Sequence, residues 1–152
     1  MEFPILKRAL IVSTISITLV GCAGAPLGLD MGQKPMAGTW KGDFVCPPSR
    51  MSMQSFTLTL QDGGIPGAVN GIVENHLVWA GQPQYLKYTV VGSNVAGHVV
   101  LKPKQLIKRS RDDFEMGYLE GDLADADTIH FKVCGREHTL TRLSAPKQTV
   151  QR

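Results

Sequence analysis

The sequence lacks a strong excess of charge of either sign, and it lacks the short motifs of common enzymes. Its 152 residues include 16 Lys and Arg against 13 Asp and Glu, for a net charge of +3. This excess is too small to predict a nucleic-acid-binding surface without a concentrated basic patch. The chain contains no Gly-X-Ser-X-Gly elbow, no phosphate-binding loop and no His-Glu-X-X-His motif. We therefore expect a non-catalytic protein that binds neither nucleic acid nor a cofactor.

The sequence also lacks an apolar run long enough to span a bilayer. The longest run, residues 9–20, has 12 residues and is diluted by Ser and Thr, whereas a transmembrane helix needs about 20. Lys7 and Arg8 precede this run. A positively charged start followed by a short apolar stretch is typical of an export signal, so we expect residues 1–21 to be a signal peptide.

The end of this stretch, Leu19-Val20-Gly21-Cys22, resembles the lipobox of bacterial lipoproteins. The resemblance implies cleavage before Cys22 and acylation of its thiol and its new amino group. Two or more acyl chains hold a protein firmly on a membrane. Ala23 stands where Asp is the inner-membrane signal in the enterobacterial pattern, which implies an outer-membrane anchor facing the periplasm. The alternative is a buried transmembrane anchor or a chance match to the motif.

Cysteine is scarce, with three residues in the chain. Lipidation of Cys22 would leave Cys46 and Cys134, and the cell envelope is oxidising enough to join them. Such a disulfide would close a loop of roughly 90 residues and contribute about 4 kcal/mol in the loop-entropy model. The two residues have opposite parity along their expected strands, so the bridge also requires a bend or a bulge. The alternative is two free, buried thiols.

The rest of the composition indicates a small, turn-rich domain. Hydrophobic residues make up 43%, with 16 Gly and 9 Pro, which excludes a disordered tail, a collagen-like repeat and a long coiled coil. Residues 22–37 are rich in Gly and Pro and predict a flexible tether. Residues 38–145 alternate apolar and polar side chains, and residues 146–152 are expected to be a disordered tail. The expected strands are residues 39–45, 55–61, 69–75, 85–92, 98–102, 116–123, 128–134 and 137–143.

The spacing of these strands predicts an all-β antiparallel meander that closes into a barrel, with a sandwich or a partly open sheet as the alternative. If Gly135-Arg136 forms the last hairpin loop, Phe131 faces Leu140 and Arg142 points inward. An inward Arg needs a partner, and Trp40 can supply one by stacking with the guanidinium.

Gly38-Thr39-Trp40 and Arg142 together resemble the lipocalins and related calycin barrels, whose first strand begins Gly-X-Trp and whose last strand carries an Arg packed over that Trp. The resemblance implies an eight-stranded, lipocalin-like barrel closed by Trp40 and Arg142. A barrel of this size is either filled by its own side chains or holds one small ligand. The residues expected to face the interior are Trp40, Phe44, Phe56, Leu58, Leu60, Leu86, Tyr88, Val90, Phe131 and Leu140.

Three polar clusters are weighed as sites. His130, Cys134 and His138 have a spacing that suggests a metal site, but on strands they lie some 13 Å apart and face different sides, so we expect no metal. The acidic groups near residues 112–115 and 120–127 lack the spacing of a calcium loop and indicate solvated turns. The densest basic cluster is either a solvated loop or a contact for anionic envelope lipid or peptidoglycan; it consists of Lys102, Lys104, Lys108, Arg109 and Arg111.

Taken together, these features predict an envelope lipoprotein that acts as a binding or interaction module. Its partner would be a small apolar ligand or another envelope protein. The alternative is a structural or assembly lipoprotein that docks onto another envelope component through a sheet edge or the basic cluster. A hydrolase is the third and weakest hypothesis.

Overall fold

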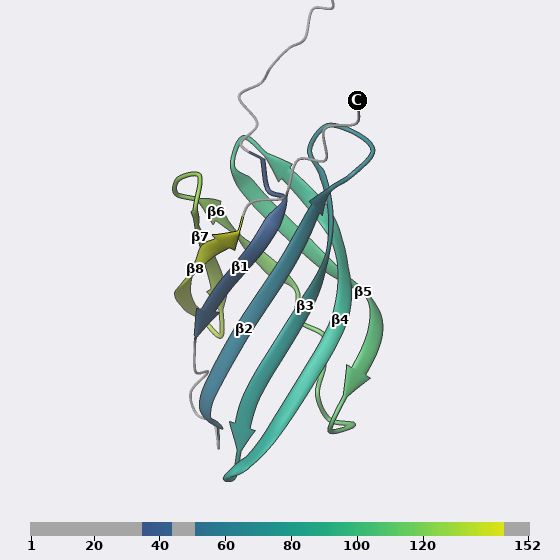
Figure 1. Ribbon diagram of the computed structural model, residues 1–152, viewed down its shortest axis with the longest axis vertical. Helices are drawn as coiled ribbons and strands as arrows, with labels where there is room; N and C mark the ends of the chain where they lie inside the picture. The colour runs from purple at the N-terminus through teal and green to yellow at the C-terminus, as the bar shows by residue number, and fades with distance from the viewer. Residues whose placement is uncertain (1–34, 44–50, 145–152) are drawn as a thin grey trace, which may run out of the picture.

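The computed structural model describes residues 35–43 and 51–144, which form one closed barrel of eight antiparallel strands (Figure 1). Each strand pairs with the next along the chain, and the last pairs with the first. The predicted signal peptide, Cys22, Phe44, Cys46 and the C-terminal tail lie outside the described residues. The strands are β1 Gly38–Asp43, β2 Met51–Asp62, β3 Ala68–Trp79, β4 Gln82–Val95, β5 His98–Arg109, β6 Leu119–Leu123, β7 Thr128–Val133 and β8 Arg136–Ser144.

Alternation of apolar and polar residues sets the inner and outer faces of the barrel. In β2, Phe56, Leu58 and Leu60 are buried while Thr59 between them is exposed. Side chains two residues apart on a strand share a face, so one strand contributes a row of three apolar groups to the core. The expected interior residues within the described part of the chain are all buried. The all-β, eight-stranded barrel predicted from the sequence is confirmed.

Three connections are two-residue turns whose second residue is Gly. Both turn residues have positive φ in each case, between 49° and 91°. This is the type I′ geometry, whose twist matches that of the flanking strands. The turns are Ala80-Gly81, Ala96-Gly97 and Cys134-Gly135.

The expected loop at Gly135-Arg136 is therefore wrong. The turn is Cys134-Gly135, and Ile129 rather than Phe131 pairs with Leu140. The observed pairing differs from the expected one by two residues along β8. Because side chains alternate with a period of two, each side chain still lies on the expected face of the sheet. Because Cys134 lies in the turn at a φ of 54°, its parity on β7 places no constraint on a disulfide.

The chain enters the barrel at one end, which we call the closed end. There the turns β2–β3, β4–β5 and β6–β7 gather around residues 35–37 (Figure 1). Met36 is buried, and its carbonyl accepts a hydrogen bond of 3.0 Å from Trp40 Nε1. The folded domain thus includes the last three residues of the predicted tether, because Met36 contributes apolar surface to the core. No helix within the described ranges is long and apolar enough to cross a membrane.

Candidate ligand-binding cavity

The opposite end of the barrel, which we call the mouth, is incompletely closed by strand pairing. β5 pairs with β4 as far as Arg109, but it pairs with β6 only from His98 to Leu101. Residues 110–118, the strap, run from β5 to β6 across this side of the mouth (Figure 1). Phe114 and Met116 of the strap pack against the core.

A cavity of about 370 Å³ opens at the mouth beneath the strap. At about 30 Å³ per water molecule, its volume corresponds to a dozen waters, and it lies at the small end of the range of ligand sites. Side chains from β2, β3, β4 and β7 form its floor and walls, and the strap forms its outer edge. Its lining consists of Phe56, Asn75, Leu77, Trp79, Leu86, Tyr88, Asp113, Phe114, Glu115, Gly117, Tyr118, Leu119, Val133 and Cys134.

Tyr88 ties the strap to the barrel wall from inside. Its hydroxyl donates a hydrogen bond of 3.2 Å to the carbonyl of Gly117. Burial raises the pKa of Tyr88 to about 12, although the Gly117 hydrogen bond opposes the shift. The phenol therefore stays neutral at physiological pH, and its proton remains committed to the strap.

Two arginines of the expected basic cluster hold the strap in shape: Arg109 joins it to β5, and Arg111 forms a pair within it. Arg109 donates to the carbonyl of Phe114 at 3.3 Å and to Asp112 at 3.2 Å. Arg111 binds Asp113 through two hydrogen bonds of 2.8 and 2.6 Å, and this guanidinium holds the pKa of Asp113 below its usual range. Asp112 and Asp113 lie in an exposed turn, as the sequence predicts, and each also pairs with an arginine.

The lysines of the same cluster lie on a strand rather than in a loop. Lys102, Lys104 and Lys108 are exposed residues of β5, and the Lys108 ammonium lies 4.9 Å from the centre of the Tyr85 ring. The expected solvated loop is wrong because the strand continues to Arg109, with irregular pairing to β4. Beyond Leu101, among the described residues, this part of β5 pairs with a strand on one side only.

Trp40 and Arg142 meet at the closed end. The Arg142 guanidinium lies 4.1 Å from the centre of the Trp40 ring, in the arrangement predicted from the sequence. Its N–H groups also donate to the carbonyls of Ala37, Pro35 and Ala126. The Arg142 side chain is 8% exposed, so one buried cation joins the N-terminal segment, β8 and the β6–β7 turn.

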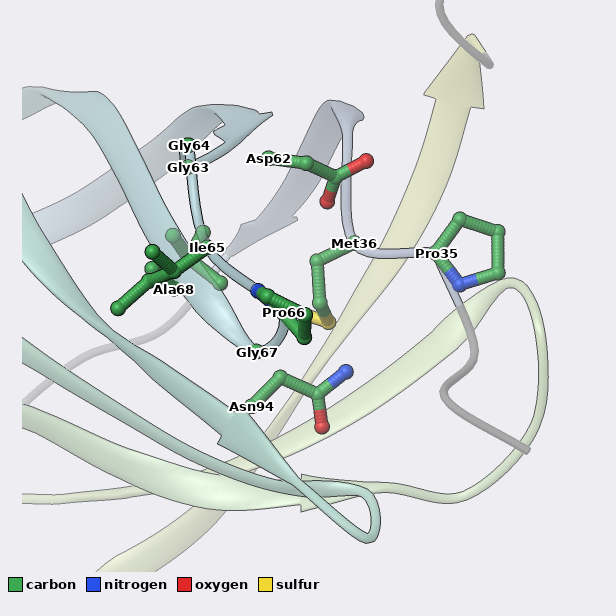
Figure 2. Close-up of a pocket in the computed structure, with 11 residues that line it drawn as sticks. Pro35, Met36, Asp62, Gly63, Gly64, Ile65, Pro66, Gly67, Ala68 and Asn94 are labelled. Atoms are coloured by element: carbon green, nitrogen blue, oxygen red, sulfur yellow. The ribbon is translucent and has the colours of Figure 1, made fainter. Parts of the chain in front are cut away.

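A second hollow, of about 290 Å³, lies at the closed end beside residues 35 and 36 (Figure 2). Its wall is largely the Gly- and Pro-rich β2–β3 turn, residues 63–67. Asn94 faces it, but the Asn94 side-chain oxygen already accepts a hydrogen bond of 3.1 Å from the backbone N–H of Gly97. This hollow offers few convergent side chains, so we regard the mouth as the candidate site.

The predicted disulfide lies partly outside the described residues. Cys134 borders the mouth, and its sulfur is not a free thiol. Cys46 belongs to the connection between β1 and β2 and is not described. The pairing of these two cysteines stays a prediction.

The histidines lie on strands and contact neighbouring polar groups. His130 Nδ1 lies 3.1 Å from Thr139 Oγ1 and 3.6 Å from a Glu137 oxygen. His98 on β5 contacts Asp122 at 2.8 Å and Glu120 at 3.5 Å, and the Asp122 hydrogen bond raises the pKa of His98.

Glu120 and Asp122 are exposed residues of β6, within the strand expected at residues 116–123, so they are solvated as expected but do not lie in a turn. Across residues 35–43 and 51–144, no group of three or more His, Cys, Asp or Glu side chains is arranged to hold a metal ion.

The residues that form the mouth were not identified as a site from the sequence. The strap carries Phe114, Met116 and Tyr118 within a connection between strands. Apolar side chains at alternate positions in a connection indicate that it packs on the core, and this was the available signal. No protein-family profile matches the chain, and no curated protein matches its sequence.

Proposed function

We propose that the protein is a lipid-anchored envelope lipoprotein whose barrel binds a small, largely apolar ligand without catalysing its conversion. The observation that carries the proposal is the apolar cavity at the mouth. Trp79, Leu77, Leu86 and Phe114 supply large apolar surfaces to it, and a few polar groups border it, as is typical of small-molecule sites. The anchor is Cys22, and the outer-membrane, periplasmic location follows from the lipobox resemblance.

The positions of the chain entry and the cavity are consistent with this arrangement. A tether from Cys22 would join the barrel at Pro35, at the closed end. The mouth lies at the opposite end of the strands. An anchored barrel would therefore keep its cavity free of the attachment point. A disulfide between Cys46 and Cys134 would brace the rim, because Cys134 lines the cavity.

The binding proposal is tested by native mass spectrometry of the chain from residue 22, with Cys22→Ser, exported to a periplasm behind a cleavable signal peptide. We expect the native mass to exceed the denatured mass by that of a retained ligand. If that ligand is lost in purification, we expect saturable fluorescence of the neutral dye N-phenyl-1-naphthylamine. Absence of both the extra mass and the dye signal would overturn the proposal.

A cavity-filling variant locates the binding site. Leu77 is nearly buried and lines the cavity, so Leu77→Trp should fill part of the space and weaken dye binding at least tenfold. Ile65→Trp adds the same ring to an exposed position at the closed end and should leave the dye affinity unchanged. Equal dye affinities in the two variants would place the bound dye elsewhere.

The anchoring proposal has its own test. Cys22→Ser in the full-length chain, with its own signal peptide, should abolish acylation and leave an uncleaved precursor, because the lipoprotein peptidase cuts before an acylated cysteine. The measurement is metabolic labelling with a radioactive fatty acid, together with the mass of the product. Normal maturation of the variant would refute the lipoprotein assignment.

A second candidate function is docking onto another envelope protein, and one feature favours it. Residues 102–109 of β5 present an edge that no strand of the described residues covers. Lys102, Pro103 and Lys104 are, however, the kinds of residue that protect an edge from pairing. Cross-linking from Lys104 in cells to one envelope protein, without any dye binding at the mouth, would favour docking over ligand binding.

A further inference from the structure

The polar groups at the edge of the mouth cavity are nearly all hydrogen-bond acceptors. The charged residues that line the cavity within the described part of the chain are two carboxylates, Asp113 and Glu115. Tyr88 donates its hydroxyl proton to a strap carbonyl, and Tyr118 donates its own to Glu120, each at 3.2 Å. Both phenol oxygens therefore offer lone pairs to the cavity edge. Apart from the Asn75 amide, which also lines the cavity, these polar side chains offer acceptors, so the edge favours a ligand group that donates hydrogen bonds.

The two carboxylates differ in whether a cationic side chain neutralises their charge. Asp113 is bound by the Arg111 guanidinium. Glu115 is exposed and forms no ion pair within the described residues. One negative charge of the cavity lining is therefore left for a ligand to neutralise.

The rim already holds a cation against aromatic rings. The Arg111 guanidinium lies 5.4 Å from the centre of the Trp79 ring and 5.6 Å from that of Phe114, and both rings line the cavity. Aromatic faces beside a carboxylate are the usual means by which proteins recognise ammonium groups. The Arg111 guanidinium, held between these two rings and the Asp113 carboxylate, is an example of such cation binding at the rim of this cavity.

Building on the proposed binding function, we propose that the cavity selects a cationic amphiphile and discriminates against an anionic one with the same apolar body. The cavity has room for somewhat more than a dozen non-hydrogen atoms, because its volume corresponds to about a dozen waters and each such atom occupies less than the roughly 30 Å³ of a water molecule. The ammonium or guanidinium group of the amphiphile lies near Glu115. An anionic head group at the same place would face the like charge of Glu115, while the nearby Arg111 cation is already paired with Asp113. Coulomb repulsion at the partly solvated rim is expected to separate the two affinities about tenfold.

The test is displacement of N-phenyl-1-naphthylamine from the chain beginning at residue 22, with Cys22→Ser, which contains every described residue. The competitors are decyltrimethylammonium and decyl sulfate, which share one alkyl chain and are used below their micelle concentrations. We expect the cation to displace half of the dye at about one tenth of the concentration needed for the anion. Added NaCl should narrow this ratio, because salt screens charges at the exposed rim.

Variants of Glu115 assign the selectivity to the rim. Glu115→Gln should reduce the ratio to about threefold, and Glu115→Lys should reverse the order of the competitors. The control is Glu137→Gln, which removes an exposed carboxylate that does not line the cavity. This control should leave both the dye affinity and the ratio unchanged.

The outcomes separate this inference from the function on which it rests. Absence of saturable dye binding to the unsubstituted cavity would overturn ligand binding itself. Dye binding with equal displacement by the two competitors, or a ratio that Glu115→Lys does not move, would overturn charge selection alone. An anion that displaces the dye better than the cation would also overturn it.

Discussion

Replacement of Arg142 tests whether one buried cation closes the barrel. Arg142→Met keeps an unbranched side chain of similar length over Trp40 but removes the charge and all N–H donors. The variant loses the hydrogen bonds to the carbonyls of Pro35, Ala37 and Ala126. It also loses the ion pair with Asp127 at 3.2 Å and the stacking at 4.1 Å from the Trp40 ring centre. The change therefore disconnects the N-terminal segment from β8 without adding bulk.

The expected loss of stability follows from these contacts. The partly buried bond to Ala37 is charge-assisted and accounts for about 2 kcal/mol. The bonds to Pro35 and Ala126 and the ion pair with the exposed Asp127 carboxylate together add about 1 kcal/mol, and the cation–π contact adds about 1 kcal/mol. Burial of the guanidinium has a desolvation cost that the variant does not carry, and this offsets part of the lost stability. We expect a net loss of about 3 kcal/mol, which corresponds to a decrease in Tm of about 12 °C for a domain of this size.

The assay is urea unfolding, monitored by tryptophan fluorescence. The variant and the unsubstituted protein are analysed with the same m value, which is the dependence of the free energy of unfolding on urea concentration. Arg136→Met is the matched control, because Arg136 is an exposed residue at the other end of β8, and it should change stability by less than about 0.5 kcal/mol. A loss for Arg142→Met within about 1 kcal/mol of this control would refute the argument that Arg142 joins the closed end.

Three further predictions concern the backbone, the mouth and the disulfide. Gly121→Ala would place a Cβ 2.0 Å from a backbone oxygen of β7, whereas nothing lies within 4 Å of a Cβ at Gly64. In thermal unfolding, Gly121→Ala should lower the free energy of unfolding by about 3 kcal/mol or more, and Gly64→Ala should leave it almost unchanged. Because the pKa of Tyr88 is raised to about 12 in the folded state, the free energy of unfolding should fall between pH 10 and pH 12, by up to about 1.4 kcal/mol per pH unit; Tyr88→Phe should lack this component in urea titrations across that range. Reduction of a Cys46–Cys134 bridge should lower the free energy of unfolding by up to about 4 kcal/mol; two titratable thiols in the unfolded, unreduced protein would contradict the bridge.

Local sequence pattern was enough to find the strands, because the side-chain period of two is imposed by each strand alone. The alternation in β2, with Phe56, Leu58 and Leu60 on one side, predicts its inner face correctly. The last hairpin shows the limit of the same signal. The period specifies which side of the sheet a residue faces but not its exact partner, so the pairing of Leu140 was misplaced by two residues while its face was right.

The candidate site was less predictable because its parts are distant in sequence. Trp79 at the end of β3 and Phe114 in the strap pack edge to face, with ring centres 6.5 Å apart. Arg111 contacts both rings, yet in the sequence it belongs to a basic run that indicates a solvated loop. Only the crossing of the strap over the mouth turns these residues into one lining.

The sequence by itself determined the all-β class, the number of strands and the residues that fill the barrel, because these depend on periodicity and on turn residues that act locally. It also paired Trp40 with Arg142, since an inward cation requires a partner. Tertiary structure alone decided that β5 extends beyond its pairing with β6, that the strap covers the gap left beside β5 and that a cavity remains beneath the strap. The length over which two strands pair, and the space left between side chains, depend on how the whole barrel closes, so no local pattern in the chain records them.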